Sequence, residues 1–181
     1  MGNTNTISLM NGKPREGNQG GTSTTETVFT TDGTTAVVLP LPSASQLSAA
    51  GAPCGRFRVR AAGRVVTGGT INFAVALYFG TSTTVASNTK ISDSGNVSLA
   101  SLTTNWFIEA DLVWDGDSNR INGRAWNQVH TTAEALATID NAITSADPDG
   151  DATLGFVVSW TFGTGNASNK VYLDKFQIDE I

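Results

Sequence analysis

The chain has 181 residues, of which 11 are basic and 16 acidic, so its formal net charge is −5 and only 15% of it is charged. A chain of this length fits one domain with a sizeable core. The acidic balance argues against diffuse attraction to nucleic acid or anionic lipid, and no stretch has the ~20 apolar residues of a membrane span. We therefore expect neither nucleic acid nor a membrane as partner.

The first 23 residues form a polar, glycine-rich segment. Its apolar side chains are mainly Ile7, Leu9 and Met10, too few to offset the entropy lost when the segment becomes ordered alone. We expect an extended N-terminal arm at 1–23, lying against its own globule or a neighbouring subunit, and one domain at 24–181. The arm lacks the basic start and apolar run of a secretory signal, which predicts a protein that stays in the cytosol where it is made.

The domain begins with a predicted hairpin. Asp32-Gly33 suits a two-residue turn between strands at 25–31 and 36–41, and the prolines at 40 and 42 are expected to end the pairing. Further strands with alternating apolar side chains are predicted at 56–66, 71–80, 85–92, 105–115, 121–129, 154–162 and 171–181.

Two short helical segments and one β-bulge are also predicted. A helical turn is expected around 45–50, and the spacing of apolar residues predicts a surface helix over 133–143. In the last strand the apolar positions shift by one residue near Asp174 and Lys175, which predicts a bulge.

These elements predict an all-β fold, an antiparallel jelly-roll β-sandwich with an extended N-terminal arm. Many strands in hairpins without a βαβ rhythm are typical of sandwiches. The long rows of apolar side chains on one face of each strand, and a last strand that returns to the domain's edge, favour a jelly roll. The segment Val171–Ile178 resembles the closing strand of jelly-roll modules, including carbohydrate-binding ones.

Catalytic groups are scarce, so we expect no enzyme. His130 has no Gly-x-Ser-x-Gly serine to activate, and Cys54 lies in a turn-rich stretch. Glu109 and Asp111 share one strand face about 7 Å apart, which is compatible with glycoside hydrolysis. A solvated strand face has the same composition, and we favour that interpretation.

Two acidic loops resemble the start of a calcium-binding loop, and neither completes it. The loop at 115–119 and the loop with Asp147, Asp149 and Asp151 offer alternating oxygen ligands, but both lack the glycine and glutamate that the full motif requires. No cofactor is expected apart from structural calcium at Asp147, Asp149 and Asp151.

Two surfaces are candidates for binding. Arg56, Arg58 and Arg60 share one face of a strand in an acidic molecule, so they form either a docking surface for an acidic partner or an ordinary solvated face. Tyr78 and Trp126 are candidate platforms for a sugar ring, although such aromatics more often pack at the rim between sheets.

The arm, the Gly/Thr/Asn-rich jelly roll and the segments Leu77–Ser82 and Asn105–Ala110 resemble virion proteins of tailed bacteriophages, especially the decoration or cement proteins outside capsids. The resemblance implies a structural homo-oligomer, often a trimer, that is made in the host cytoplasm and sits on the virion surface. Such a protein binds the major capsid protein and stabilises the capsid by bridging subunits. The expected partner-binding residues are Ile7, Leu9, Met10, Lys13, Arg15, Arg56, Arg58 and Arg60. The alternative is a carbohydrate-binding jelly-roll module, associated with a fibre or a polysaccharide, that uses Tyr78 or Trp126.

Overall fold

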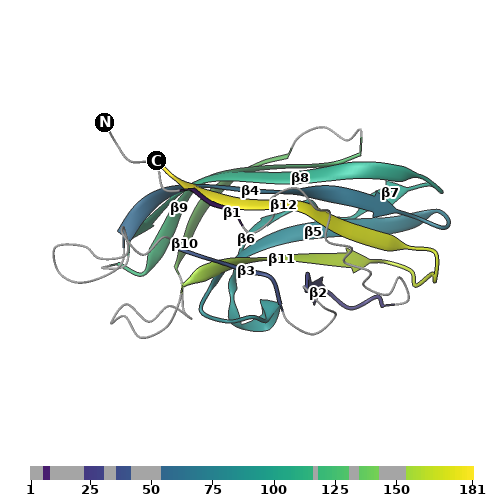
Figure 1. Ribbon diagram of the computed structural model, residues 1–181, viewed down its shortest axis with the longest axis horizontal. Coiled ribbons are helices and arrows are strands. Elements are labelled where there is room, and N and C mark those ends of the chain that lie inside the picture. Colours follow the sequence, from purple (N-terminus) through teal and green to yellow (C-terminus); the bar gives the residue numbers. More distant parts are fainter. Residues whose placement is uncertain are drawn as a thin grey trace.

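A computed structural model describes residues 6–8, 23–30, 36–41, 54–115, 118–130, 135–142 and 154–181. These residues form two layers of antiparallel strands (Figure 1). The first sheet has the order β1 (Thr6–Ser8), β12 (Lys170–Glu180), β4 (Cys54–Val66), β8 (Thr103–Asp115), β9 (Arg120–Val129) and β10 (Ala135–Ala142). The second sheet has the order β2 (Thr27–Val28), β11 (Gly155–Phe162), β5 (Ile71–Gly80) and β6 (Thr89–Asp93). Within it, β3 (Val38–Pro40) also pairs with β11 and β7 (Val97–Leu99) with β5.

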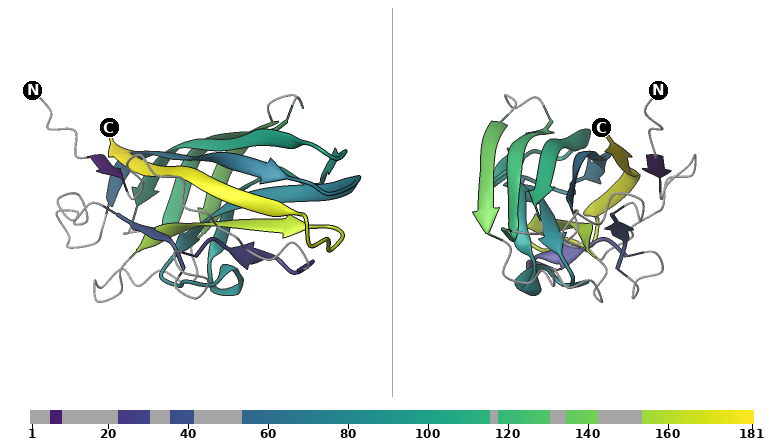
Figure 2. Two further views of the ribbon diagram at one scale, coloured as in Figure 1. Left: turned by 45° about the vertical axis from the view of Figure 1, so that its right-hand side comes forward. Right: turned by 90° about the vertical axis from the view of Figure 1, so that its left-hand side faces the viewer.

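The predicted all-β, antiparallel jelly-roll sandwich is confirmed. The chain crosses between the sheets after β1, β3, β4, β7, β10 and β11, and the end view shows the first sheet curving over the second (Figure 2). The described part of the chain contains one short 3-10 turn, η2 (Val85–Ser87), where a longer strand over 85–92 was expected. No helix within the described ranges is both long and apolar enough to cross a lipid bilayer.

The core lies between the two sheets and is rich in aromatic side chains. Alternation along each strand sends every second side chain inward, so Trp106 and Trp114 of β8 are both almost fully buried. The ring of Phe79 packs 5.2 Å from that of Trp114 and 4.8 Å from that of Phe156. These contacts connect β8 of the first sheet to β5 and β11 of the second, and they hold the sandwich together.

The predicted hairpin at 25–41 is wrong. β2 and β3 both pair with β11, one after the other, so they form a single edge strand that is interrupted between them. Between β2 and β3, Thr30 and Ala36 form an isolated antiparallel bridge. Next to it, the backbone N–H of Val37 donates to the carbonyl of Phe29. Pro40 is still part of β3, because an edge strand tolerates a residue without a backbone N–H.

The predicted helix at 133–143 is also wrong. Residues 135–142 form β10, which pairs with β9 along its whole length. Ile139 is buried while Thr138 and Asp140 are exposed, so the side chains alternate with a period of two. The free edge beside β9 offers a ladder of backbone hydrogen bonds, which outweighs the apolar spacing that favoured a helix. The segment predicted as a helical turn at 45–50 lies outside the described residues.

The bulge predicted in the last strand is confirmed. The register between β12 and β4 shifts between Leu173 and Lys175, so no residue of β4 is paired opposite Asp174. The one-residue slip keeps Leu173 and Phe176 both buried, and it leaves Asp174 free to turn toward Arg64.

Gly123 of β9 lies so close to the backbone of β8 that a larger residue cannot fit without strain. Its φ is +152°, which side chains rarely adopt, and a Cβ there would lie 2.0 Å from the backbone oxygen of Asp111. We expect Gly123→Ala to lower the free energy of unfolding by at least about 2 kcal/mol. Chemical denaturation followed by circular dichroism measures this change. In the matched control Gly69→Ala, where a Cβ meets nothing within 4 Å, the change should stay below about 0.5 kcal/mol.

Candidate functional site

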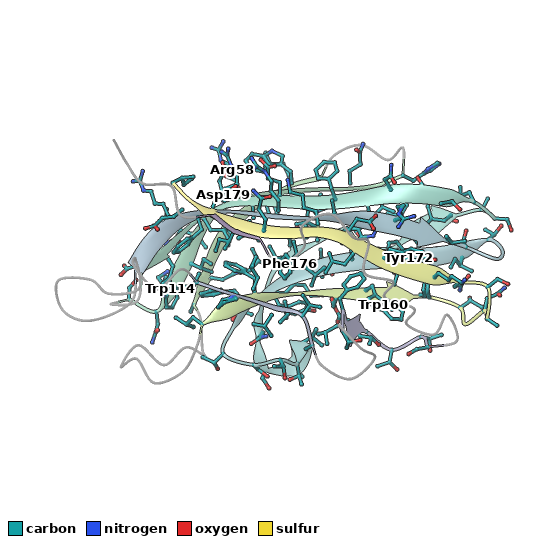
Figure 3. The ribbon with its side chains drawn as sticks, in the orientation of Figure 1. Arg58, Trp114, Trp160, Tyr172, Phe176 and Asp179 are labelled. Atoms are coloured by element: carbon teal, nitrogen blue, oxygen red, sulfur yellow. The ribbon has the colours of Figure 1, made fainter. Side chains whose placement is uncertain are left out.

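The outer face of the first sheet carries a ladder of ion pairs across β12, β4 and β8. Arg58 donates two hydrogen bonds to Asp111, at 2.6 and 2.8 Å. Arg60 donates to Glu109 at 2.8 Å and to Asp179 at 3.1 Å. Figure 3 shows Arg58 and Asp179 together on the outer side of the sheet, whereas Trp114 and Phe176 point between the two sheets.

The ion pairs fix the charge state of this face. The hydrogen bonds from Arg58, followed by its charge, hold the pKa of Asp111 below its ordinary value of 3.8. The same contact raises the pKa of Arg58 above its ordinary range. Asp111 is therefore ionised at neutral pH, which disfavours it as a general acid for glycoside hydrolysis.

The three predicted docking arginines lie on one face of β4, as expected from their spacing. Arg58 and Arg60 both point into the ion-pair ladder, where carboxylates from β8 and β12 compensate their charges. Arg56 is exposed and lies near the end of the strand, opposite Val113 of β8. The positive stripe seen in the sequence is thus largely neutralised by neighbouring strands.

Beside this ladder, a shallow groove of about 490 Å³ runs over the outer face of β4, β8 and β9. The hollow lies where Ala62 interrupts the row of arginines on the outer face of β4, next to the buried Gly63. Phe107 of β8 lies half-buried opposite Ala62, and Gln128 of β9 lies opposite Phe107. The groove is lined by Ala62, Gly63, Thr104, Asn105, Trp106, Phe107, Gln128, His130 and Asp174.

A fixed carboxylate forms one end of the groove. Arg64 donates two hydrogen bonds to Asp174, at 2.8 and 3.0 Å, and its guanidinium lies 4.7 Å from the centre of the Tyr172 ring. This bidentate pair between a strand and a bulge gives the carboxylate a set orientation beside the groove.

His130 forms the opposite end of the groove. It has a left-handed backbone with φ +61°, a conformation that is uncommon for a residue with a side chain. Its backbone N–H donates to the carbonyl of Asn105, and its Nδ1 lies 2.9 Å from the hydroxyl of Thr104. These two contacts hold His130 at the edge of the groove.

Of the two predicted sugar platforms, the structure places Trp126 on the surface and excludes Tyr78. Trp126 is half-buried on the outer face of β9, next to the groove. Tyr78 is only 5% exposed, and its hydroxyl donates to Glu26. Burial and this hydrogen bond raise its pKa to about 12. Its ring packs with Ala76 and Val157, so Tyr78 cannot stack on a ligand.

A smaller hollow of about 200 Å³ lies on the outer face of the second sheet, beside Glu26, Lys90 and Asp93. Its charged groups are already engaged with protein partners. Glu26 accepts hydrogen bonds from Tyr78 and from the fully buried Ser159, while Lys90 donates to Asp93 at 2.8 Å.

The remaining predicted site residues have no described side chains. Asp147, Asp149, Asp151, Leu9, Met10, Lys13 and Arg15 lie outside the described residues. Ile7 lies in β1, whose backbone pairs with Ile178 of β12, so this part of the arm adds a strand to its own sheet. Within the described residues, no group of three or more His, Cys, Asp or Glu side chains could hold a metal, and the predicted calcium loop at 147–151 stays a prediction.

Sequence reasoning missed the groove itself, although two of its signals were present. Ala62 breaks the arginine stripe, and the predicted bulge falls at Asp174. Neither signal shows that Asn105, Phe107 and Gln128 meet around Ala62, since that depends on the register of β8 and β9.

No protein-family model matches the sequence, and no curated protein does either. Solved structures with a similar fold include winged bean acidic lectin complexed with methyl-alpha-D-galactose, at 10% identity and TM-score 0.42, covering 98% of each chain. They also include the Lotus tetragonolobus seed lectin, at 9% identity and TM-score 0.40, covering 81% of this chain and 79% of that one. Peanut lectin has 10% identity and a TM-score of 0.38, with 98% and 91% covered. TM-scores below 0.5 at such identities say nothing of a shared ligand.

The ion-pair ladder predicts a pH-dependent stability. Because the folded-state pKa of Asp111 is lowered, its stabilising contribution is present above about pH 4 and is lost as the pH falls through the folded value. We expect Asp111→Asn to cost about 0.5–1 kcal/mol at pH 7, since the pair is partly exposed. Urea denaturation of both proteins at pH 7 and at pH 2.5 should show the difference shrinking in acid.

The matched control is Asp140→Asn. Asp140 pairs with Arg120 on the same sheet, but its side chain is far more exposed than that of Asp111, so the change should be close to zero. An equal loss of unfolding free energy in both variants would show that the lower exposure of the Arg58–Asp111 pair does not make it more stabilising.

Proposed function

We propose that this protein is a non-catalytic carbohydrate-binding module whose ligand lies in the groove over β4, β8 and β9. The groove is the feature that supports the proposal most directly. Its volume of about 490 Å³ falls within the range of small-molecule sites, and it combines one aromatic ring with amide, imidazole and carboxylate groups.

This combination suits the chemistry of a sugar. A pyranose ring has hydroxyl groups around its rim and apolar C–H groups on its faces. Phe107 offers an apolar surface for such a face, while Asn105 and Gln128 carry both donors and acceptors for neighbouring hydroxyls. The fixed carboxylate of Asp174 adds an acceptor whose orientation is already set by Arg64.

The charge distribution favours a neutral polar ligand over an ionic one. Arg64 and Asp174 compensate each other at one end of the groove, and Arg60 and Glu109 do so beside it. An anionic or cationic ligand would have to compete with these pairs and would lose its own hydration. The hydroxyl groups of a sugar can form hydrogen bonds to an ion pair without separating its two charged groups.

The role of a capsid decoration protein, predicted from the sequence, stays a prediction. The described residues provide less support for it than for sugar binding, because the charges of Arg58 and Arg60 are compensated within the sheet. Residues 6–8 of the arm pair with β12 of the same chain, which is one of the two placements expected for the arm.

Substitutions in the groove test the proposal. We expect Phe107→Ala and Gln128→Ala each to weaken glycan binding by about 5- to 30-fold, because each removes a contact worth about 1–2 kcal/mol. A glycan array identifies the bound sugars, and isothermal titration calorimetry measures their affinity. Thermal melting should show that the Gln128→Ala protein, which changes a surface side chain, remains folded.

The control is Val113→Ala, which alters an exposed apolar side chain on the same face of β8 but outside the groove. It should bind as the unmodified protein does. Failure of the unmodified protein to bind any glycan on the array, or binding that survives both groove substitutions, would contradict the proposal.

A further inference from the structure

An apolar surface continues from the groove toward the edge of the first sheet. Phe107 lies at the floor of the groove on β8, and Trp126 lies half-buried on the neighbouring strand, opposite Glu109. Leu136 of β10 lies opposite Trp126 in the next ladder and is 59% exposed. The three side chains follow one another across β8, β9 and β10.

The spacing of these residues matches successive rings of a chain better than one ring. Phe107 and Trp126 are diagonal neighbours on adjacent antiparallel strands, which places their backbones roughly 7 Å apart. A single pyranose ring cannot cover Phe107, Trp126 and Leu136 together, whereas a chain of linked rings can pass over all three. The path runs across the strands and ends at β10, the last strand of the sheet.

Resting on the proposed function, we propose that the ligand is a glycan chain of at least two rings, with one ring in the groove at Phe107 and the next on Trp126 beside Leu136. The ligand class is therefore an oligosaccharide or an internal stretch of a polysaccharide, and not a single terminal sugar. Trp126 selects for chain length, and the groove residues bind the first ring.

The same surface is less suited to a protein partner. Among the described residues, the exposed large apolar side chains are Val113 of β8, Leu136 of β10 and Ile181, which follows β12. The neighbours of Trp126 on this face include the compensated Arg60–Glu109 pair and the exposed Arg124. A narrow apolar path beside charged groups fits a thin ligand with hydroxyl edges, whereas protein interfaces need a larger apolar centre.

A chain-length series tests the proposal. The probes are glucose, cellobiose and cellotetraose, together with the matching mannose, xylose and maltose series, measured by isothermal titration calorimetry. For the series that binds, we expect the affinity of the unmodified protein to rise about 3- to 10-fold from one ring to two, which corresponds to one aromatic contact. Trp126→Ala should abolish this rise and leave the affinity for the single ring within about 2-fold.

Two variants act as controls for Trp126→Ala. Trp126→Phe keeps an aromatic ring and should retain most of the rise, whereas Phe107→Ala should weaken the binding of single rings and chains alike. A flat dependence on chain length, or an equal loss for one ring and two in Trp126→Ala, would overturn this inference and leave the proposed function standing. If no probe binds and the glycan array is also empty, the proposed function fails, and this inference fails with it.

Discussion

The central constraint in this protein is the antiparallel register between β4 and β8, which pairs Cys54–Val66 with Thr103–Asp115 along both strands. Side chains alternate along a strand, so this register sends Phe57 and Trp106 into the core and keeps Arg58 and Asp111 opposite each other outside. A slip of one residue would bury the charges and expose the tryptophans. The core and the outer ladder of ion pairs therefore support the same alignment, one by burial and the other by charge.

The groove is a consequence of that alignment. Where β4 has Ala62, its outer face lacks a long side chain, while its partner strands keep theirs. The bulge in β12 then turns Asp174 toward Arg64, and the two side chains form one wall. Most of the groups around the hollow belong to strands in the middle of the sheet, so their positions are set before a ligand arrives, which lowers the entropy lost on binding.

Local patterns in the sequence predict the strands and the bulge, because alternation and a shift in alternation are properties of neighbouring residues. They do not predict which strands pair. Asp32-Gly33 favours a hairpin, yet β2 and β3 pair with β11, and residues 135–142 have helical spacing, yet they complete a ladder beside β9. The same limitation hides the site, since the partners of Arg58 and the neighbours of Phe107 come from strands about 50 and 20 residues away.

The two outer faces of the sandwich show why pairing, and not charge alone, decides what a surface can bind. On the second sheet, the hydroxyls of Tyr78 and Ser159 both donate to Glu26, so the carboxylate is occupied within the fold. On the first sheet, both oxygens of Asp174 likewise accept hydrogen bonds, from Arg64, and this residue lines the groove. A carboxylate held by an arginine remains a strong acceptor for hydroxyl groups, yet it adds no net charge that would attract ions. A protein of formal charge −5 can in this way present a locally neutral, hydrogen-bonding surface, which is the condition that a neutral glycan requires.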